Sequence, residues 1–372
     1  GEQACNPLVL EVIRPLAQKY HARLVALEHR YYGISQPRPS LSLEDLQFLT
    51  YDNALRDLVT FEVDAIRNQH WTGKWIVFGG SYSGVLAAYY HSTYPGLSRG
   101  AIASSAPVVP RNTFAEFDAY TAKIVGPTCT ANVRSALKQI ETASPSELEA
   151  IKAEFEAYNI HDKLDFLGLL ADVTGMAIQF GFKDPFCASL AESPLEGYAQ
   201  FTANIFHLLG VDPVQFTPEG AMSTDPNLYS GFFGIRQWTY QTCQEFGAWN
   251  IANSDETHSL RSALLTTDYY QNVCKRLFNI ETAPDVSKLD KAYYQPLLSN
   301  GHNIHFTNGT EDPWSKMSLI AENNNTTNKH LTYTMIENGV HTQDLAPASE
   351  EDSPSLQNAR AVTDALIGQW LQ

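Results

Sequence analysis

Short apolar runs alternate with helically spaced apolar positions along the first hundred residues. The apolar run over residues 22–33 predicts a strand that runs into a loop ending at Gly33, and the run over residues 74–78 predicts a short buried strand that meets two glycines. Between these runs, apolar residues over 50–69 recur at helical spacing. Small apolar residues over 84–94 predict a close-packed helix before the next apolar run at 100–108. This alternation predicts a parallel sheet that is covered on both faces.

The alternation of strands and helices stops after Pro110. The next 180 or so residues carry helical patterns, for example at 146–158, together with aromatic-rich stretches and four of the five cysteines. Strand-like runs return at 303–308 and 331–336, and a helical pattern at 355–371 ends the chain. We therefore predict an α/β core from residues 1–110 and 291–372, interrupted by a mainly helical cap at 111–290.

The formal net charge of −16 restricts the classes of partner. Binding to nucleic acid needs a basic face, so this charge argues against a nucleic-acid partner. A strongly acidic chain suits work at low pH, where carboxylates become protonated and repel one another less. No stretch reaches the roughly 18 apolar residues that span a bilayer, and no signal-peptide pattern opens the chain.

The cysteines and glycosylation motifs indicate a secretory route. The five cysteines lack Cys-x-x-Cys spacing, so we expect no zinc site and no other metal or cofactor. The odd count leaves one cysteine without an internal partner, and Cys5 is the best candidate. Asn-x-Thr motifs begin at Asn308, Asn324 and Asn325, and we take these asparagines as glycosylation candidates. Together these features favour a disulfide-bonded secreted, lysosomal or vacuolar protein.

Ser81 lies where a buried strand passes directly into a helix. In such a turn the serine is held in a strained conformation and its hydroxyl projects above the sheet. Small residues are needed two positions to either side, and Gly79 and Ser83 meet that need. The backbone N–H of Tyr82 would then supply one donor of an oxyanion hole. A glycine-rich turn without catalysis is the plain alternative.

Asp312 and His341 complete a candidate catalytic triad. Asp312 follows the apolar run that ends near 306, and the proline after it stiffens the turn, so we prefer it to Glu311. His341 lies between the last strand-like run and the final helix. The chain order Ser81, Asp312, His341 is that of the α/β-hydrolases, and it differs from the orders in chymotrypsin and subtilisin.

Six blocks of sequence resemble one known family. They are Glu28-His-Arg-Tyr-Tyr-Gly33, Phe78-Gly-Gly-Ser-Tyr-Ser-Gly84, Ala103-Ser-Ser-Ala-Pro107, Gln237-Trp-Thr-Tyr-Gln-Thr-Cys-Gln-Glu245, Asn308-Gly-x-x-Asp-Pro-Trp314 and Gly339-x-His-x-x-Asp344. In family order and over nearly the whole chain, these blocks resemble the prolyl carboxypeptidase family. That family includes dipeptidyl peptidase II, thymus-specific serine protease and fungal acid prolyl endopeptidases. The residue at Ser83 and the Gln-Thr-Cys-x-Glu block are most similar to the thymus-specific and fungal branches.

The resemblance implies an α/β-hydrolase core with a helical cap, and cleavage after proline, often at acid pH. A pocket for the rigid proline ring should be short, apolar and aromatic. Trp314 is the best candidate for its wall, with Trp238 and Tyr240 as candidates from the cap; plain core packing explains the latter two equally well. The family also carries two or three strands before its oxyanion loop. We therefore expect the first core strands to be missing here and the second oxyanion donor to lie near Gly1 or Glu2.

The sequence leaves the mode of cleavage open. The leading hypothesis is a serine peptidase acting on the C-terminal side of proline or alanine in peptide substrates. An esterase on the same fold and an inactive peptide-binding homologue are the alternatives. Glu2 and Glu245 are candidate carboxylates for a substrate ammonium, but exopeptidase and endopeptidase action are not distinguished. Disulfide pairing and oligomeric state also stay open.

Overall fold

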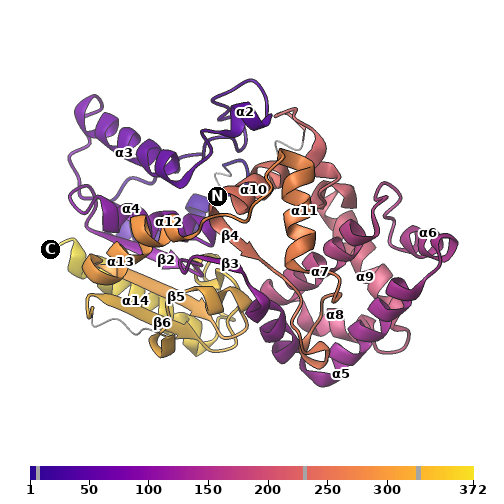
Figure 1. The fold of residues 1–372 in the computed structure, drawn as a ribbon. Helices are drawn as coiled ribbons and strands as arrows, with labels where there is room; N and C mark the ends of the chain where they lie inside the picture. The colour runs from indigo at the N-terminus through magenta and orange to yellow at the C-terminus, as the bar shows by residue number, and fades with distance from the viewer. Residues whose placement is uncertain (6–8, 229–232, 324–327) are drawn as a thin grey trace. The chain divides into compact units, whose positions relative to one another are not determined.

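The computed structural model describes residues 1–5, 9–228, 233–323 and 328–372, and the chain divides into two compact units. Unit 1 comprises Gly1–Pro110, Pro226–Gln237 and Asp285–Gln372. Unit 2 comprises Arg111–Asp225 and Trp238–Pro284. Figure 1 traces both units along the chain. The short segment 226–237 groups with unit 1, although its sequence neighbours on either side group with unit 2.

Unit 1 is built on a parallel sheet of four strands in the order β1-β2-β5-β6 among the described residues. The strands are β1 (Ile76–Gly80), β2 (Gly100–Ser104), β5 (Ile304–Gly309) and β6 (Leu331–Ile336). Every residue of β2 and β5 is buried, as expected for inner strands of a parallel sheet with both faces covered. The register aligns the carboxyl ends: Gly80 pairs with Ser104, Ser104 with Thr307, and Gly309 with Ile336.

Helices α4 and α14 of unit 1 pack against this sheet (Figure 1). Helix α4 packs against β1 and β2, α14 against β2 and β6, and α3 against α4. The Thr50 side chain caps α3 by accepting a hydrogen bond from Asn53 N–H. The helices are α1 (Val9–Lys19), α2 (Leu43–Leu46), α3 (Tyr51–Arg67), α4 (Tyr82–Thr93), α12 (Ser287–Leu289), α13 (Gln295–Asn300) and α14 (Pro354–Trp370).

The predicted strand within residues 22–33 is wrong. The structure has no strand there, and His29 and Arg30 instead lead into a turn that runs to Gly33. A strand needs ladder hydrogen bonds to a neighbour, whereas β1 is the outermost member of the described sheet on that edge. Apolar content alone therefore misassigned this segment.

Unit 2 is mainly helical, with one two-stranded parallel ladder of β3 (Arg111–Thr113) and β4 (Gly247–Trp249). Its core contains a cluster of aromatic rings in which Phe155 packs edge-on against both Phe166 and Tyr198. The helices are α5 (Ala115–Thr142), α6 (Pro145–Glu154), α7 (Lys163–Gln179), α8 (Lys183–Ser189), α9 (Pro194–Leu209) and α11 (Thr267–Phe278). Helix α10 (Ile235–Gln241) begins in unit 1 and ends in unit 2.

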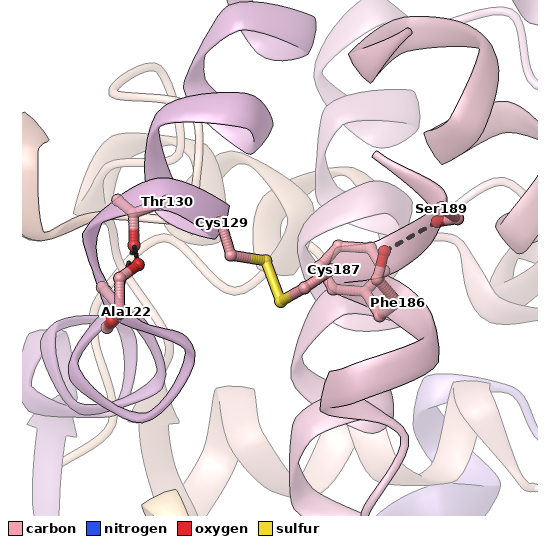
Figure 2. Close-up of a disulfide and its surroundings, with 7 residues drawn as sticks. Ala122, Cys129, Thr130, Phe186, Cys187 and Ser189 are labelled. Carbon is pink, nitrogen blue, oxygen red and sulfur yellow. Dashed lines mark hydrogen bonds between the residues drawn. A yellow bond between two sulfur atoms is a disulfide. The ribbon is translucent and has the colours of Figure 1, made fainter. Parts of the chain in front are cut away.

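Two disulfides join distant parts of unit 2. Cys129 of α5 is bonded to Cys187 of α8, beside the buried ring of Phe186 (Figure 2). Cys243 is bonded to Cys274 of α11. Cys5 is exposed and lies outside both bridges, which confirms the expectation that it is the odd cysteine. Across the described ranges, no helix is long and apolar enough to cross a membrane.

Candidate active site

Ser81 occupies the turn between β1 and α4 with backbone angles φ 56° and ψ −129°. A positive φ is costly for a residue that has a Cβ, so the surroundings must hold the turn in place. Ser81 N–H donates to the Ser104 carbonyl at the end of β2. A methyl group at Gly79 would lie 2.0 Å from the Ser83 carbonyl oxygen, so only glycine fits where the strand and helix backbones meet.

Two further residues near the carboxyl ends of the strands share this unusual backbone. Ser105, directly after β2, has φ 48°, and Thr342 has φ 55°. They contact one another, because Thr342 N–H donates to Ser105 Oγ over 2.8 Å. Strained residues of this kind concentrate at functional sites. Three of the positive-φ residues, Ser81, Ser105 and Thr342, lie where the Ser81 turn and the His341 loop meet the sheet.

Asp312 and His341 form a buried pair. His341 Nδ1 lies 2.9 Å from Asp312 Oδ2, and the two side chains are 4% and 0% exposed. The other carboxylate oxygen, Oδ1, accepts from Trp314 N–H over 2.9 Å. Because a carboxylate only accepts, Nδ1 carries the hydrogen, which leaves Nε2 of the neutral ring as the proton acceptor.

The His341 loop packs directly on the Ser81 turn. A methyl group at Gly80 would lie 3.0 Å from Thr342 Cγ2 and 2.9 Å from Leu345 Cδ1. The residue before Ser81 is thus in contact with the residue after His341. The structure brings Ser81, Asp312 and His341 to one edge of the sheet, as their positions in the sequence predict.

Asp344 is a residue of this site whose part the sequence reasoning missed. Its Oδ1 accepts from Ser104 Oγ at 2.5 Å and its Oδ2 accepts from Thr307 Oγ1 at 2.6 Å. These hydroxyls belong to β2 and β5, so one carboxylate ties the His341 loop to two strands. Burial raises the pKa of Asp344, and the two hydroxyl donors oppose that rise. The Gly-x-His-x-x-Asp spacing was the only signal in the sequence.

The candidate oxyanion donors lie beside the same turn. Tyr82 is the first residue of α4, where backbone N–H groups have no partner within the helix. A methyl group at Gly1 would lie 3.0 Å from Ser83 Oγ, so Gly1 is adjacent to the start of this helix. Burial raises the pKa of the Glu2 carboxyl, and the nearby His341 is among the influences that lower it. The assignment of Gly1 or Glu2 as a second donor stays a prediction.

The predicted substrate-binding residues fall in both units. Trp314 belongs to unit 1, and its ring centre lies 6.4 Å from that of His341 at an angle of 46°. Trp238 packs on Phe246, and Tyr240 packs edge-on against Phe278 within unit 2. Glu245, in the same segment, is partly buried. The assignment of these unit 2 residues to substrate binding also stays a prediction.

One glycosylation prediction requires correction. Asn308 lies within β5, is 2% exposed, and donates its side-chain N–H to the Leu319 carbonyl. A glycan cannot be accommodated on an amide buried inside the sheet, so Asn308 is not a glycan site in this fold. Asn324 and Asn325 lie outside the described residues. Among the described residues, no group of three or more histidine, cysteine, aspartate or glutamate side chains could hold a metal ion.

Comparison with known proteins decides the family. The model of the serine carboxypeptidase S28 family matches residues 3–184 and 209–363. The chain belongs to the serine carboxypeptidase S28 family. It is therefore a serine-type peptidase, and its core is an α/β-hydrolase fold with a mainly helical insertion.

Relatives in this S28 family cover most of the chain. A probable serine protease, EDA2, of Arabidopsis thaliana is 32% identical over 86% of this chain and 67% of its own length. The human thymus-specific serine protease is 28% identical over 96% of this chain and 75% of its own. The bovine lysosomal Pro-X carboxypeptidase is 27% identical over 96% and 76%, respectively.

A solved structure that aligns with the chain has a lower sequence identity than these relatives. An epoxide hydrolase from Bacillus megaterium aligns over 97% of this chain and 89% of its own at 12% identity, with a TM-score of 0.32. A likeness at this level says nothing about the reaction.

Proposed function

We propose that Ser81, Asp312 and His341 are the catalytic triad of this S28 peptidase. The observation that carries the proposal is the buried pair of Asp312 and His341, 2.9 Å apart, together with the packing of the His341 loop against the Ser81 turn. Burial strengthens the interaction between carboxylate and imidazole, because water is excluded from both. The pair is thus suited to hold His341 in the tautomer that can accept a proton at Nε2.

The reaction that follows from these roles has two halves. Ser81 Oγ attacks the peptide carbonyl carbon while His341 Nε2 takes the hydroxyl proton. The tetrahedral intermediate collapses when His341 returns that proton to the leaving nitrogen, and an ester on Ser81 remains. Water then loses a proton to His341 and displaces Ser81, which is reprotonated. Tyr82 N–H stabilises the negative oxygen in both halves.

We further propose that the residue before the cleaved bond is proline or alanine, and that the enzyme works at acid pH. The partly buried Trp314 ring, near His341, supports an aromatic wall for the rigid pyrrolidine ring. One relative is named a Pro-X carboxypeptidase. The net charge of −16 and several buried carboxyls with raised pKa support function in acid.

Paired serine variants test the triad. Ser81→Ala should lower turnover by about 10⁴-fold or more, because the acyl-enzyme cannot form. It should also abolish labelling by a fluorophosphonate. Ser92→Ala, on helix α4 that follows the Ser81 turn, is the matched control and should retain both activities. Full labelling of Ser81→Ala would overturn the assignment. An unmodified chain that binds peptides but neither cleaves them nor reacts would favour the inactive homologue.

A peptide library tests the specificity. Peptides with every residue before the bond, incubated from pH 4 to pH 8 and analysed by mass, should be cut after proline or alanine, fastest in acid. Trp314→Ala should raise KM for proline peptides about tenfold, and Trp314→Phe should recover part of the loss. Cleavage after residues other than proline or alanine would contradict this specificity. A KM for proline peptides that is the same in Trp314→Ala and Trp314→Phe would also contradict it. Fragment lengths also distinguish exopeptidase from endopeptidase action.

The route of the protein through the cell belongs to the same proposal. Two disulfides and the lysosomal Pro-X carboxypeptidase relative support a secreted or lysosomal location, where disulfides persist. Removal of N-linked glycans from protein made in eukaryotic cells tests this route. A fall in mass on enzymatic deglycosylation supports it, with Asn324 and Asn325 as the candidate carriers.

A further inference from the structure

The block Glu28–Gly33 is assigned no part by the proposed triad, yet its side chains are closely bonded. Glu28 accepts from the backbone N–H groups of Cys5, Ile34 and Ser35 at 2.9, 3.1 and 2.8 Å. Arg30 donates to both carboxylate oxygens of Asp57 at 2.6 and 2.5 Å. A bidentate arginine–carboxylate pair is geometrically demanding, so it fixes the segment firmly against α3.

The two tyrosines of the block add further ties. The Tyr31 hydroxyl donates to the Asp45 carbonyl, and the Tyr31 carbonyl accepts from the side chains of Gln36 and Gln237. Tyr31 itself has φ 69°, a conformation that needs such support. Tyr32 is 1% exposed, and its ring meets the His29 ring edge-on at 5.2 Å. The residues before and after His29 in the chain, Glu28 and 30–32, are therefore all fixed by contacts of their own.

His29 connects this rigid block to the residue after Ser81. Its Nδ1 lies 2.7 Å from the Arg30 carbonyl oxygen, and its Nε2 lies 3.2 Å from the Tyr82 hydroxyl. A carbonyl only accepts, so Nδ1 carries the hydrogen and Nε2 of the neutral ring must accept from Tyr82 O–H. Burial lowers the pKa of His29 to about 4, which keeps the ring neutral above that pH.

The Tyr82 side chain is positioned by these contacts and by packing. It is 1% exposed, and its ring contacts those of His29 and Tyr51, with centroid distances of 5.5 and 5.4 Å. The side chain and the N–H of Tyr82 share one Cα at the first turn of α4. Fixing the ring and its hydroxyl therefore restricts the direction in which that N–H points.

We infer that His29 is a positioning residue for the oxyanion hole, acting through its hydrogen bond to the Tyr82 hydroxyl. The inference rests on the proposed function, because it concerns the donor beside Ser81. It assigns the Glu28–Gly33 block the role of a rigid support behind the nucleophile. His29 touches no reacting atom, and its effect should fall on the transition state rather than on substrate binding.

A double-mutant cycle tests the inference. Tyr82→Phe removes one oxygen atom and His29→Phe removes the acceptor, and both keep an aromatic ring. Each variant should lower kcat about five- to tenfold, as expected for one hydrogen bond, with KM within about twofold. The double variant should be no slower than the slower single variant, because both remove the same interaction. Fluorophosphonate labelling of Ser81 should slow by a similar factor.

A conservative variant separates positioning from general damage to the fold. His29→Gln offers an amide oxygen as acceptor and should recover part of the kcat lost in His29→Phe. Unchanged kcat in Tyr82→Phe, or losses that multiply in the double variant, would overturn the role of His29. Failure of the proposed function is a separate result: the unmodified chain would then show no labelling at Ser81, which would remove both assignments together.

Discussion

At the scale of single residues, Asp344 shows how the candidate site depends on buried hydrogen bonds. Its two oxygens accept from hydroxyls on β2 and β5, while Thr342 N–H donates to Ser105 Oγ. These bonds fasten both sides of the turn that follows His341. Because Thr342 adopts φ 55°, the turn is not the conformation that its residues would choose alone. Loss of these hydrogen bonds should let His341 move away from Ser81.

Replacing Asp344 should affect turnover more than binding. Asp344→Ala leaves two buried hydroxyls without their acceptor and should cost about 1–3 kcal/mol of stability. If His341 is the proposed general base, a shift of its imidazole on the order of 1 Å would lower kcat on the order of 10- to 100-fold. Asp344→Asn, which can still bond both hydroxyls, should retain more activity. Steady-state kinetics and thermal unfolding measure both effects.

The control for this substitution is an exposed aspartate in the same unit. Asp52 forms a surface pair with Arg56 and is 54% exposed, so Asp52→Ala should change neither kcat nor stability appreciably. Equal kcat in Asp344→Ala and in the unmodified enzyme would show that the loop holds His341 without this carboxylate.

The sequence predicted the residues with chemical signatures and missed those defined by distant contacts. Ser81, Asp312 and His341 each stand at a recognisable place, after a strand or before a helix, and the structure brings them together. Asp344 bonds Ser104 across 240 positions of chain, which no local pattern reveals. The glycosylation prediction at Asn308 failed for the opposite reason. The Asn-x-Thr motif is a local pattern, whereas the burial of Asn308 depends on parts of the chain distant in sequence.

At the scale of elements, the contact between α3 and α4 contains a buried carboxyl group. Glu62 of α3 is 3% exposed, and its Oε2 accepts from the Tyr90 hydroxyl of α4 at 2.6 Å. Its Oε1 has no hydrogen-bond partner among the residues that the structure describes. Burial raises the pKa of Glu62, so the folded protein holds the proton more tightly than the unfolded chain does. Its contribution to stability is present in acid and is lost as pH rises through the folded pKa.

Glu62→Gln should therefore stabilise the protein more at pH 7.5 than at pH 4.5. The glutamine keeps an acceptor for Tyr90 and carries no charge that burial would penalise. Thermal unfolding at the two pH values measures the difference, with the exposed Glu44→Gln as the control that should show none. A gain for Glu62→Gln that is equal at both pH values would contradict a raised pKa.

The disulfide between α5 and α8 leads to a second prediction at the scale of elements. Cys129 and Cys187 are 58 residues apart, and closing a loop of that length stabilises by about 4 kcal/mol in the chain-entropy description. Replacing both cysteines by serine should lower the denaturant midpoint accordingly and expose α5 and α8 to hydrogen exchange. Cys5→Ser, which removes the exposed thiol outside the bridges, should change nothing. Equal midpoints would show that packing alone holds these helices.

One predicted strand failed for a physical reason, whereas the runs at 74–78, 100–108, 303–308 and 331–336 correspond to β1, β2, β5 and β6. Apolar spacing over 50–69 corresponds to α3, and the small residues over 84–94 fall within or beside α4, because a helix makes its hydrogen bonds within one segment. A strand depends on a neighbour. The apolar run at 22–33 lacks one in this sheet, so the pattern predicted a strand that the structure does not form.

At the scale of the whole molecule, buried carboxyls and buried histidines have opposite effects on the way stability changes with pH. Burial raises the pKa of the Asp165 carboxyl, as it does for Glu62 and Asp344. These groups favour the folded state in acid, and their contribution is lost as pH rises through their folded pKa values. The net charge of −16 adds repulsion at neutral pH. This side of the balance favours an acid-stable protein.

Buried histidines limit the stability of the folded protein in acid. Burial lowers the pKa of His91 and of His305 to about 4, and both side chains are at most 1% exposed. His302 faces His91 with ring centroids 5.1 Å apart and lowers its pKa further. A lowered pKa means that the folded state prefers the neutral ring, so stability is full above pH 6.5 and is lost as pH falls toward 4. Stability should therefore be greatest in weak acid.

His305→Asn tests the acid side of this balance. His305 Nδ1 lies 2.8 Å from Thr332 Oγ1, and its Nε2 has no hydrogen-bond partner within the described part of the chain, so protonation places a charge in the buried sheet that no described hydrogen bond at Nε2 stabilises. Each such histidine should cost on the order of 3 kcal/mol between pH 6.5 and pH 4. The variant should start less stable at pH 7 because it leaves a cavity, yet lose less stability on acidification. His70→Asn, at an exposed residue with φ 55° that asparagine tolerates, should follow the unmodified protein at every pH. Parallel stability curves for His305→Asn and the unmodified protein would mean that His305 does not set the acid limit.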